Sequence, residues 1–190
     1  MFAVQENLIA LLEAVEDCLA KQRILPCLTL LYSGIDVVAS LEQTASTRST
    51  FINWVEEYML KNSPLPCTGT DLYGARCGVL HSFSPESDLS KQGKARRIVY
   101  AWGKAKAEDL AAAARAMGRD ECAVHINELV SAFRVGLADY LEEVMRDSNR
   151  EQKMKERAGL WFTHMGEDAV KTFLQLYKTS PESSGSQSSV

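Results

Sequence analysis

Residues 72–87 read LYGARCGVLHSFSPES, an apolar stretch dotted with glycines that holds Arg76 and, five positions later, His81. The segment NSPLP lies just upstream, and its two prolines forbid a helix from running through it. Thr68 and Thr70 both suit the N-cap position of a new helix, and the next proline, at position 85, limits its end. The pattern therefore predicts a helix that carries Arg76 and His81 and ends near residues 84–85.

The arginine lies on the apolar face of this predicted helix. At about 100° per residue, Arg76 is about 40° from Leu72 and lies within the face that Leu72 and Val79 define. An isolated buried charge is costly, so Arg76 needs an acidic partner. Asp36 is the acid embedded in the apolar segment SGIDVVA, and we expect it to pair with Arg76. His81 diverges from Arg76 by about 140° on an ideal helix, so the sequence leaves their contact open.

Very small side chains recur every four residues along the same helix. Gly74, Gly78 and Ser82 form this strip, and His81 lies beside it. Such a strip allows another helix to approach closely. The approaching helix belongs either to the same chain or to a second copy of it.

The surrounding chain is mainly helical by its apolar periodicity. The first helix is predicted from a stripe of Leu8, Leu11, Leu12, Val15 and Leu19. The segment CLTLLYSGIDVVASL is apolar nearly all round and predicts a central buried helix. A third helix is predicted from Phe51 to the NSPLP segment. Farther on, Asn127 suits the N-cap of a long helix, and another helical stretch runs from Glu151 to about Lys178.

Between these helices the pattern changes to that of a small β insertion. RRIVYAW at 96–102 and CAVHI at 122–126 are strand-like, and AEDLAAAARAM between them is helical. We expect a strand-helix-strand unit with two parallel strands, at about residues 94–126. The fold class is thus a mainly α bundle with a two-stranded insertion, in one domain over residues 1–178. The polar tail at 179–190 is predicted to be disordered.

Composition narrows the functional classes. The chain has 190 residues, a net charge of −4 and 46% hydrophobic residues, which suits a single globular domain. No apolar run approaches the length of a membrane span, and the acidic first 20 residues do not resemble a signal peptide, so we expect a cytoplasmic protein. The five cysteines lack CxxC spacing, which predicts reduced thiols with no metal and no cofactor.

One local basic run stands out on this acidic chain. Residues 91–106 hold six basic side chains and no acid. Within this run, Lys94, Arg96 and Arg97 are candidates for binding phosphates. An ordinary solvated surface explains the run equally well.

The segment RCGVLH at 76–81 resembles the R-x4–6-H signature of the HEPN superfamily (higher eukaryotes and prokaryotes nucleotide-binding domain). The wider stretch DLYGARCGVLHSFSPESDLSKQGKARRIVYAWG is similar to small bacterial HEPN-like proteins, and the resemblance covers roughly residues 28–144. It implies an up-and-down helical bundle that forms a homodimer. It also implies a metal-independent endoribonuclease for single-stranded RNA, acting as a toxin or antiviral effector, with a possible protein antitoxin or regulatory partner.

Two further arginine–histidine pairs have similar spacing. Arg119 precedes His125, and Arg157 precedes His164. The first of these pairs straddles a predicted loop and strand, and the second lies in a late helix. We prefer the pair at 76 and 81 because of its helical context, its glycine strip and the SFSPES segment that follows.

The enzyme hypothesis assigns a role to each residue near the motif. An imidazole exchanges protons near neutral pH, so His81 would act as general acid or base. Arg76 would stabilise the phosphorane through its planar fork of donors. Asp36 would hold the guanidinium, while Cys77 and Tyr73 would lie beside it, with Tyr73 a possible base-stacking residue.

Two alternatives stay open. Cys77 and the acidic net charge favour a non-catalytic HEPN-like module that binds a nucleotide, an RNA or a protein partner. A plain helical scaffold, with a structural Arg76–Asp36 pair and an enclosed His81, is the third reading.

Overall fold

The computed structural model describes residues 2–43, 47–158, 168, 170–172, 174 and 175. Residues 1–157 form one compact unit, and residues 158–190 group separately. The compact unit is mainly helical with a two-stranded sheet, which confirms the predicted fold class. The tail predicted at 179–190 lies outside the described residues, as does most of the helical stretch predicted as far as Lys178.

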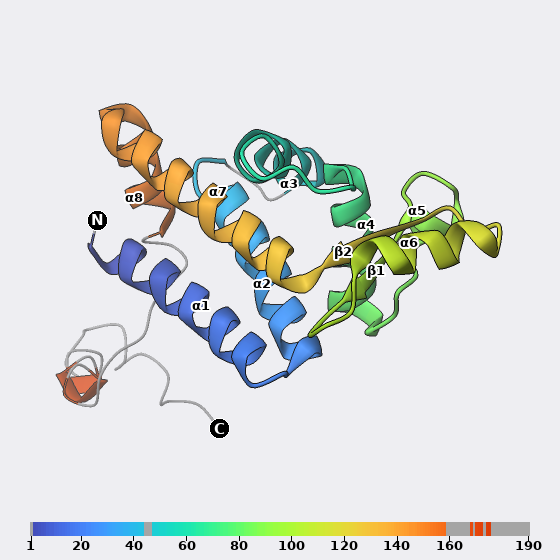
Figure 1. Ribbon diagram of the computed structural model, residues 1–190. Helices are drawn as coiled ribbons and strands as arrows, with labels where there is room; N and C mark the ends of the chain where they lie inside the picture. Colours follow the sequence, from blue (N-terminus) through green and yellow to red (C-terminus); the bar gives the residue numbers. More distant parts are fainter. Residues whose placement is uncertain (1, 44–46, 159–167, 169, 173, 176–190) are drawn as a thin grey trace, which may run out of the picture. The chain divides into compact units, whose positions relative to one another are not determined.

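The N-terminal half of the core is a pair of helices, α1 (Phe2–Ala20) and α2 (Ile24–Ser40), which pack side by side (Figure 1). Leu8 and Val15, from the predicted stripe, are buried. Helix α2 also packs against α3, α4 and α7, and its buried apolar side chains cover one broad side of the helix. The prediction of a central buried helix is confirmed.

The third helix contains a wide turn that the sequence pattern did not predict. Helix α3 (Arg48–Trp54) starts at the Thr47 cap and continues as the π-helical segment η1 (Val55–Leu60). Gly136 on α7 (Ile126–Arg146) lies against this segment, and a β-carbon there would be 2.9 Å from the Tyr58 carbonyl oxygen. The glycine therefore allows two helical backbones to touch.

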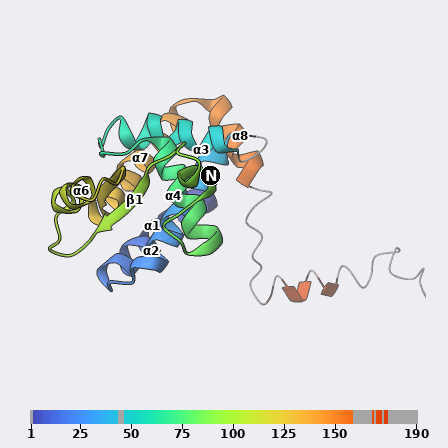
Figure 2. The same cartoon turned by 90° about the vertical axis from the view of Figure 1, so that its right-hand side faces the viewer.

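The small sheet forms as predicted. Strand β1 (Arg97–Ala101) pairs in parallel with β2 (Glu121–His125), and α6 (Ala107–Ala116) connects them. The strands and α6 lie at one end of the compact unit, away from α8 (Ser148–Ala158), in both views (Figures 1 and 2). The Tyr32 and Tyr100 hydroxyls, 2.6 Å apart, join α2 to β1 by a hydrogen bond. This bond ties the sheet to the central helix.

The predicted cap of the long helix is wrong. His125, not Asn127, occupies the N-cap position of α7, and its Nδ1 accepts a hydrogen bond from the Asn127 backbone nitrogen at 3.2 Å. The residue that ends β2 is already in extended backbone conformation, which is the conformation of an N-cap. The strand therefore passes directly into the helix.

Other sequence-based expectations concern cysteines and membranes. Cys27, Cys67 and Cys122 are buried thiols, and Cys18 and Cys77 are partly exposed. Among the described residues, no helix combines the length and apolar character that crossing a membrane requires.

The close contact between α7 and η1 predicts that a methyl group added at Gly136 destabilises the fold. Gly136→Ala should lower the free energy of unfolding by about 1–3 kcal/mol, because the opposing group is a backbone carbonyl that cannot rotate away. Urea unfolding followed by circular dichroism measures the change. Ser131→Ala, on the exposed face of the same helix, is the control. A Gly136→Ala protein that is more stable than the parent would contradict this account.

Candidate functional site

Helix α4 (Gly69–Ser82) carries both residues of the proposed motif. Thr68, one of the two predicted caps, begins it: the Thr68 hydroxyl accepts from the Asp71 backbone nitrogen at 3.2 Å. In return the Asp71 carboxylate accepts from the Thr68 nitrogen at 3.0 Å. A second acidic contact comes from η1, where Glu56 accepts from the Gly69 nitrogen at 2.6 Å. The start of α4 is thus held by side chains on both sides.

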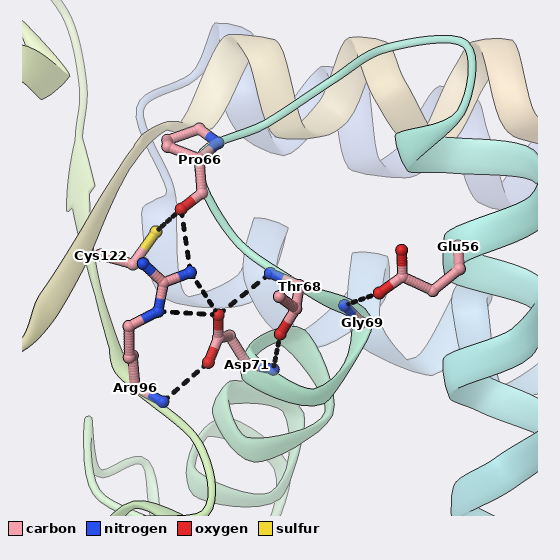
Figure 3. A network of polar contacts seen from close by, with 7 residues as sticks. All are labelled: Glu56, Pro66, Thr68, Gly69, Asp71, Arg96 and Cys122. Atoms are coloured by element: carbon pink, nitrogen blue, oxygen red, sulfur yellow. Dashed lines mark hydrogen bonds and ion pairs between the residues drawn. The ribbon is translucent and has the colours of Figure 1, made fainter.

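The Asp71 carboxylate also binds Arg96, the residue directly before β1 (Figure 3). It accepts from the Arg96 backbone nitrogen and from Arg96 Nη2, both at 2.7 Å. The same guanidinium donates to the Pro66 carbonyl at 3.1 Å, and the Cys122 thiol donates to that carbonyl at 2.8 Å. The loop before α4 is therefore joined to β2 through Cys122 and to Arg96, the residue directly before β1.

The ionisation of Asp71 reflects these partners. Burial by itself raises the pKa of its carboxyl group, but the hydrogen bonds from Thr68 and Arg96 outweigh burial and leave the pKa below its ordinary value. Asp71 is only 3% exposed, so its carboxylate stays charged because these hydrogen bonds replace bonds to water. The network is a structural support for α4.

Arg76 contacts the predicted acidic partner. Its Nε lies 2.7 Å from Asp36 Oδ2, and the two side chains are 21% and 17% exposed. Burial lowers the pKa of Arg76, but the hydrogen bond and charge of Asp36 raise it by more. Burial raises the pKa of Asp36, and Arg76 opposes only part of that rise. The predicted pairing of Arg76 with Asp36 is confirmed.

The structure also closes the gap between the arginine and the histidine. Arg76 Nη1 lies 3.1 Å from His81 Nε2, and His81 is exposed. The long arginine side chain spans the turn that separates the two residues on the helix. A guanidinium has no acceptor, so in this hydrogen bond Arg76 Nη1 donates and His81 Nε2 accepts. The Nε2 lone pair is therefore engaged by Arg76 until a ligand takes over that donor.

Two further predicted residues touch the same guanidinium. The Tyr73 ring centroid lies 5.8 Å from Arg76 Cζ, and Cys77 Sγ lies 3.9 Å from Arg76 Nη1. A second guanidinium, that of Arg48, is also 5.8 Å from the Tyr73 centroid. Tyr73 is half-buried, and its ring makes cation–π contacts with both guanidinium groups. The five residues Asp36, Tyr73, Arg76, Cys77 and His81 form one cluster, which we call the arginine cluster.

The strip of small residues has a different neighbour from the predicted one. A β-carbon on Gly74 would lie 3.1 Å from Ala95 Cβ, and one on Gly78 would collide with the Ser84 carbonyl oxygen. The segment after α4 folds back over the helix and covers these two glycines. A turning chain, not a second helix, uses the strip. The glycine spacing therefore carries no argument for a dimer.

The three basic residues predicted to bind phosphates line one cavity of about 270 Å³. Its lining residues are Asp71, Ser90, Gly93, Lys94, Ala95, Arg96, Arg97 and Asp120. Arg96 is held by Asp71, and Arg97 lies 3.3 Å from Glu86 and 3.4 Å from Glu121. The lysine hydrogen-bonds a nearby glutamine side chain at 2.8 Å. A phosphate would compete with carboxylates for both arginines, and phosphate binding stays a prediction.

Of the other two arginine–histidine pairs, only Arg119 and His125 both lie among the residues that the structure describes. His125 caps α7 and lies 3.4 Å from the Gly103 carbonyl oxygen, while Arg119 pairs with Glu121. His164 lies outside the described residues.

Sequence reasoning missed two residues near the arginine cluster. Arg48 shares the Tyr73 ring, and no sequence signal indicates that contact. Phe83 follows α4 in a left-handed conformation and is highly exposed. The sequence pattern extended the helix to about residues 84–85 and so placed Phe83 inside its last turn, without any signal for the left-handed cap that the structure has there.

The support of α4 predicts a pH-dependent loss of stability. Asp71→Ala should lower the free energy of unfolding at pH 7 by about 2–4 kcal/mol, because Arg96 and the helix start lose their partner. The folded-state pKa of Asp71 is lowered from 3.8, so its contribution is complete above pH 3.8 and is lost as the pH falls through the folded value. The difference between parent and variant should therefore shrink below pH 3.8.

Urea unfolding at a series of pH values measures this effect. Asp109→Ala, at an exposed position of α6, is the control and should change stability by about 0.5 kcal/mol or less. A pH-independent difference for Asp71→Ala would contradict the assigned role of the carboxylate.

No protein-family model, no curated protein and no solved structure matches this chain in the comparisons. The HEPN resemblance therefore stays an expectation drawn from the sequence, and the arginine cluster is interpreted from its own geometry.

Proposed function

We propose that this protein is a metal-independent endoribonuclease that cleaves single-stranded RNA at the arginine cluster. One observation carries the proposal: an exposed imidazole accepts a hydrogen bond from a guanidinium that a half-buried carboxylate holds in place. A candidate general base and a cationic hydrogen-bond donor for phosphate are thus adjacent. The HEPN resemblance of the same residues supports this choice.

The chemistry follows from the atoms present. His81 Nε2 takes the proton of the RNA 2′-hydroxyl, and the 2′-oxygen attacks the adjacent phosphorus. The new O2′–P bond forms as the P–O5′ bond breaks, and the departing 5′-oxygen receives a proton from an imidazolium or from water. The products end in a 2′,3′-cyclic phosphate and a 5′-hydroxyl.

Arg76 has donors to spare for the transition state. Its Nε donates to Asp36, whereas its Nη2 makes no hydrogen bond to any residue that the structure describes. Nη1 donates to His81, and it must first transfer that bond to a phosphoryl oxygen, which frees the Nε2 lone pair to take the proton of the 2′-hydroxyl. Donors aimed at developing negative charge contribute strongly to catalysis in a partly desolvated site.

The proposal includes a biological setting that the resemblance implies. A ribonuclease of this type acts as a toxin or antiviral effector, forms a homodimer and is restrained by a protein partner. A second copy would supply the second imidazole that protonates the leaving oxygen.

A non-catalytic binding module is the second candidate. Asp36 neutralises Arg76, and Arg76 in turn occupies the lone pair of His81, so the cluster is closed in the absence of a ligand. Such a cluster suits binding of a nucleotide, an RNA or a protein as well as catalysis. The scaffold reading required an enclosed histidine, and His81 is exposed.

Removal of the imidazole separates catalysis from binding. We expect His81→Ala to reduce cleavage of a labelled single-stranded RNA in EDTA by about 100- to 10,000-fold, because the general base is lost. Denaturing gels measure the rate, and phosphatase resistance of the 3′ ends before acid treatment identifies the cyclic phosphate. The matched control is His125→Asn, which retains a side chain able to cap α7. Equal rates for parent and His81→Ala would reject the assignment and leave the binding module.

Removal of the carboxylate tests the positioning of the guanidinium. Asp36→Asn should lower kcat by about 10-fold or more and change KM less, because a displaced Arg76 loses its alignment in the transition state. Asp36→Glu should recover part of kcat. An effect confined to thermal stability, with kcat unchanged in the folded variant, would make the pair purely structural.

A further inference from the structure

Phe83 occupies an unusual position directly after the helix that carries the arginine cluster. It is 68% exposed, and its backbone is left-handed, with φ at 47° and ψ at 33°. Gln22 is the only other residue besides glycine with positive φ among those that the structure describes. A large aromatic residue at such a position is unfavourable for the backbone and for the exposed ring.

The usual solution at this position is glycine, which adopts the left-handed conformation without strain. Phenylalanine therefore adds conformational cost and leaves its apolar ring in water. Neither feature stabilises the fold. Strained residues that persist in spite of such a cost cluster at functional sites.

The turn that presents Phe83 is held firmly. The Gly78 carbonyl oxygen accepts from the Phe83 backbone nitrogen, from the Ser84 nitrogen at 3.1 Å and from the Ser82 hydroxyl at 3.0 Å. Because Gly78 has no side chain, the Ser84 carbonyl can lie directly against the helix. The ring therefore projects from a fixed turn and not from a loose end.

Phe83 also follows the proposed reactive histidine by only two residues along the chain. Consecutive Cα atoms are about 3.8 Å apart, so the Cα atoms of Phe83 and His81 are at most about 7.6 Å apart. Both side chains are exposed. A nucleotide whose phosphate meets His81 and Arg76 can therefore bring its own base, or the base beside it, to the ring.

We propose that Phe83 is a base-stacking subsite, on which an unpaired nucleobase of the RNA stacks while the adjacent phosphodiester binds at His81 and Arg76. The inference rests on the proposed function and extends it to substrate recognition. A base inside a duplex has no free face for the ring, so the subsite selects single-stranded RNA. Stacking on an aromatic side chain accepts every base, so it selects little by sequence.

As the direct partner of the Phe83 ring, a second copy of the chain fits less well than a nucleobase, although the proposed homodimer would bring one near His81. The exposed residues next to Phe83 are His81, Ser82, Pro85 and Glu86, which are mostly polar. A stable protein interface buries about 800 Å² on each partner around an apolar centre. One ring in polar surroundings matches a nucleobase better than such an interface.

The experiment uses full-length protein with His81→Ala, which binds RNA without cleaving it. Its affinity for a fluorescein-labelled RNA of mixed sequence is measured by anisotropy, as the single strand and annealed to its complement, with a length chosen so that the duplex is stable at the assay temperature. Adding Phe83→Ala should weaken binding of the single strand by about 5- to 100-fold. Phe83→Trp should keep the affinity, and the single strand should quench its added indole fluorescence relative to the Trp-containing parent.

Phe83→Gly separates binding from folding. Glycine removes the ring and also the strain of the left-handed turn, so this variant should be at least as stable as the parent and still lose affinity. Trp102→Ala, which removes an exposed aromatic elsewhere on the surface, is the matched control and should bind as the parent does.

Each outcome decides between the two proposals. Unchanged affinity in both Phe83→Ala and Phe83→Gly overturns the subsite, and so does equal loss with duplex RNA. A change of sedimentation from dimer to monomer with RNA affinity unchanged assigns Phe83 to a contact between copies. If histidine-dependent cleavage persists with the KM of Phe83→Gly unaltered, the nuclease stands and the subsite fails. If Phe83-dependent binding occurs without any cleavage, the subsite stands and the nuclease fails.

Discussion

The position of the arginine cluster depends on one buried carboxylate, that of Asp71. It closes the capping box with Thr68, and it accepts backbone and side-chain hydrogen bonds from Arg96 (Figure 3). A buried charge is tolerated only when its bonds are satisfied, so the start of α4 and the start of β1 must stay together. The position of the rest of α4, including Arg76 and His81, depends on this contact.

The second ion pair, between Arg76 and Asp36, lies farther along α4 than Asp71. Asp36 on the central helix holds Nε of the Arg76 guanidinium, and Nη1 of the same group lies 3.1 Å from His81 Nε2. Two carboxylates on two different elements therefore serve different purposes: Asp71 fixes the helix, and Asp36 orients a side chain on it. The proposed chemistry and the proposed base subsite both lie at the far end of this helix, where Phe83 turns the chain back over Gly78.

Sequence reasoning succeeded where a local pattern and its physical cause coincide. Apolar periodicity identified the helices, and β-branched runs on either side of an alanine-rich segment identified the parallel strand pair. It failed where a contact between distant segments decides between local conformations that the neighbouring residues allow equally well. His125 took the cap from Asn127 because β2 delivers it in extended conformation, and the π-helical segment η1 lies where its backbone contacts α7 at Gly136. Neither feature is visible in a window of neighbouring residues.

The amino-acid sequence by itself determined the mainly helical class, the strand-helix-strand insertion and the pairing of Arg76 with Asp36. The last of these followed because an arginine and an acid, each embedded in an apolar helix, can satisfy one another at the lowest cost. Only the tertiary structure decided that His81 reaches the guanidinium, that Arg96 and Arg97 are paired with carboxylates, and that a returning loop covers the glycine strip. These depend on side-chain reach and on chain direction after a turn, which residue type and spacing do not encode.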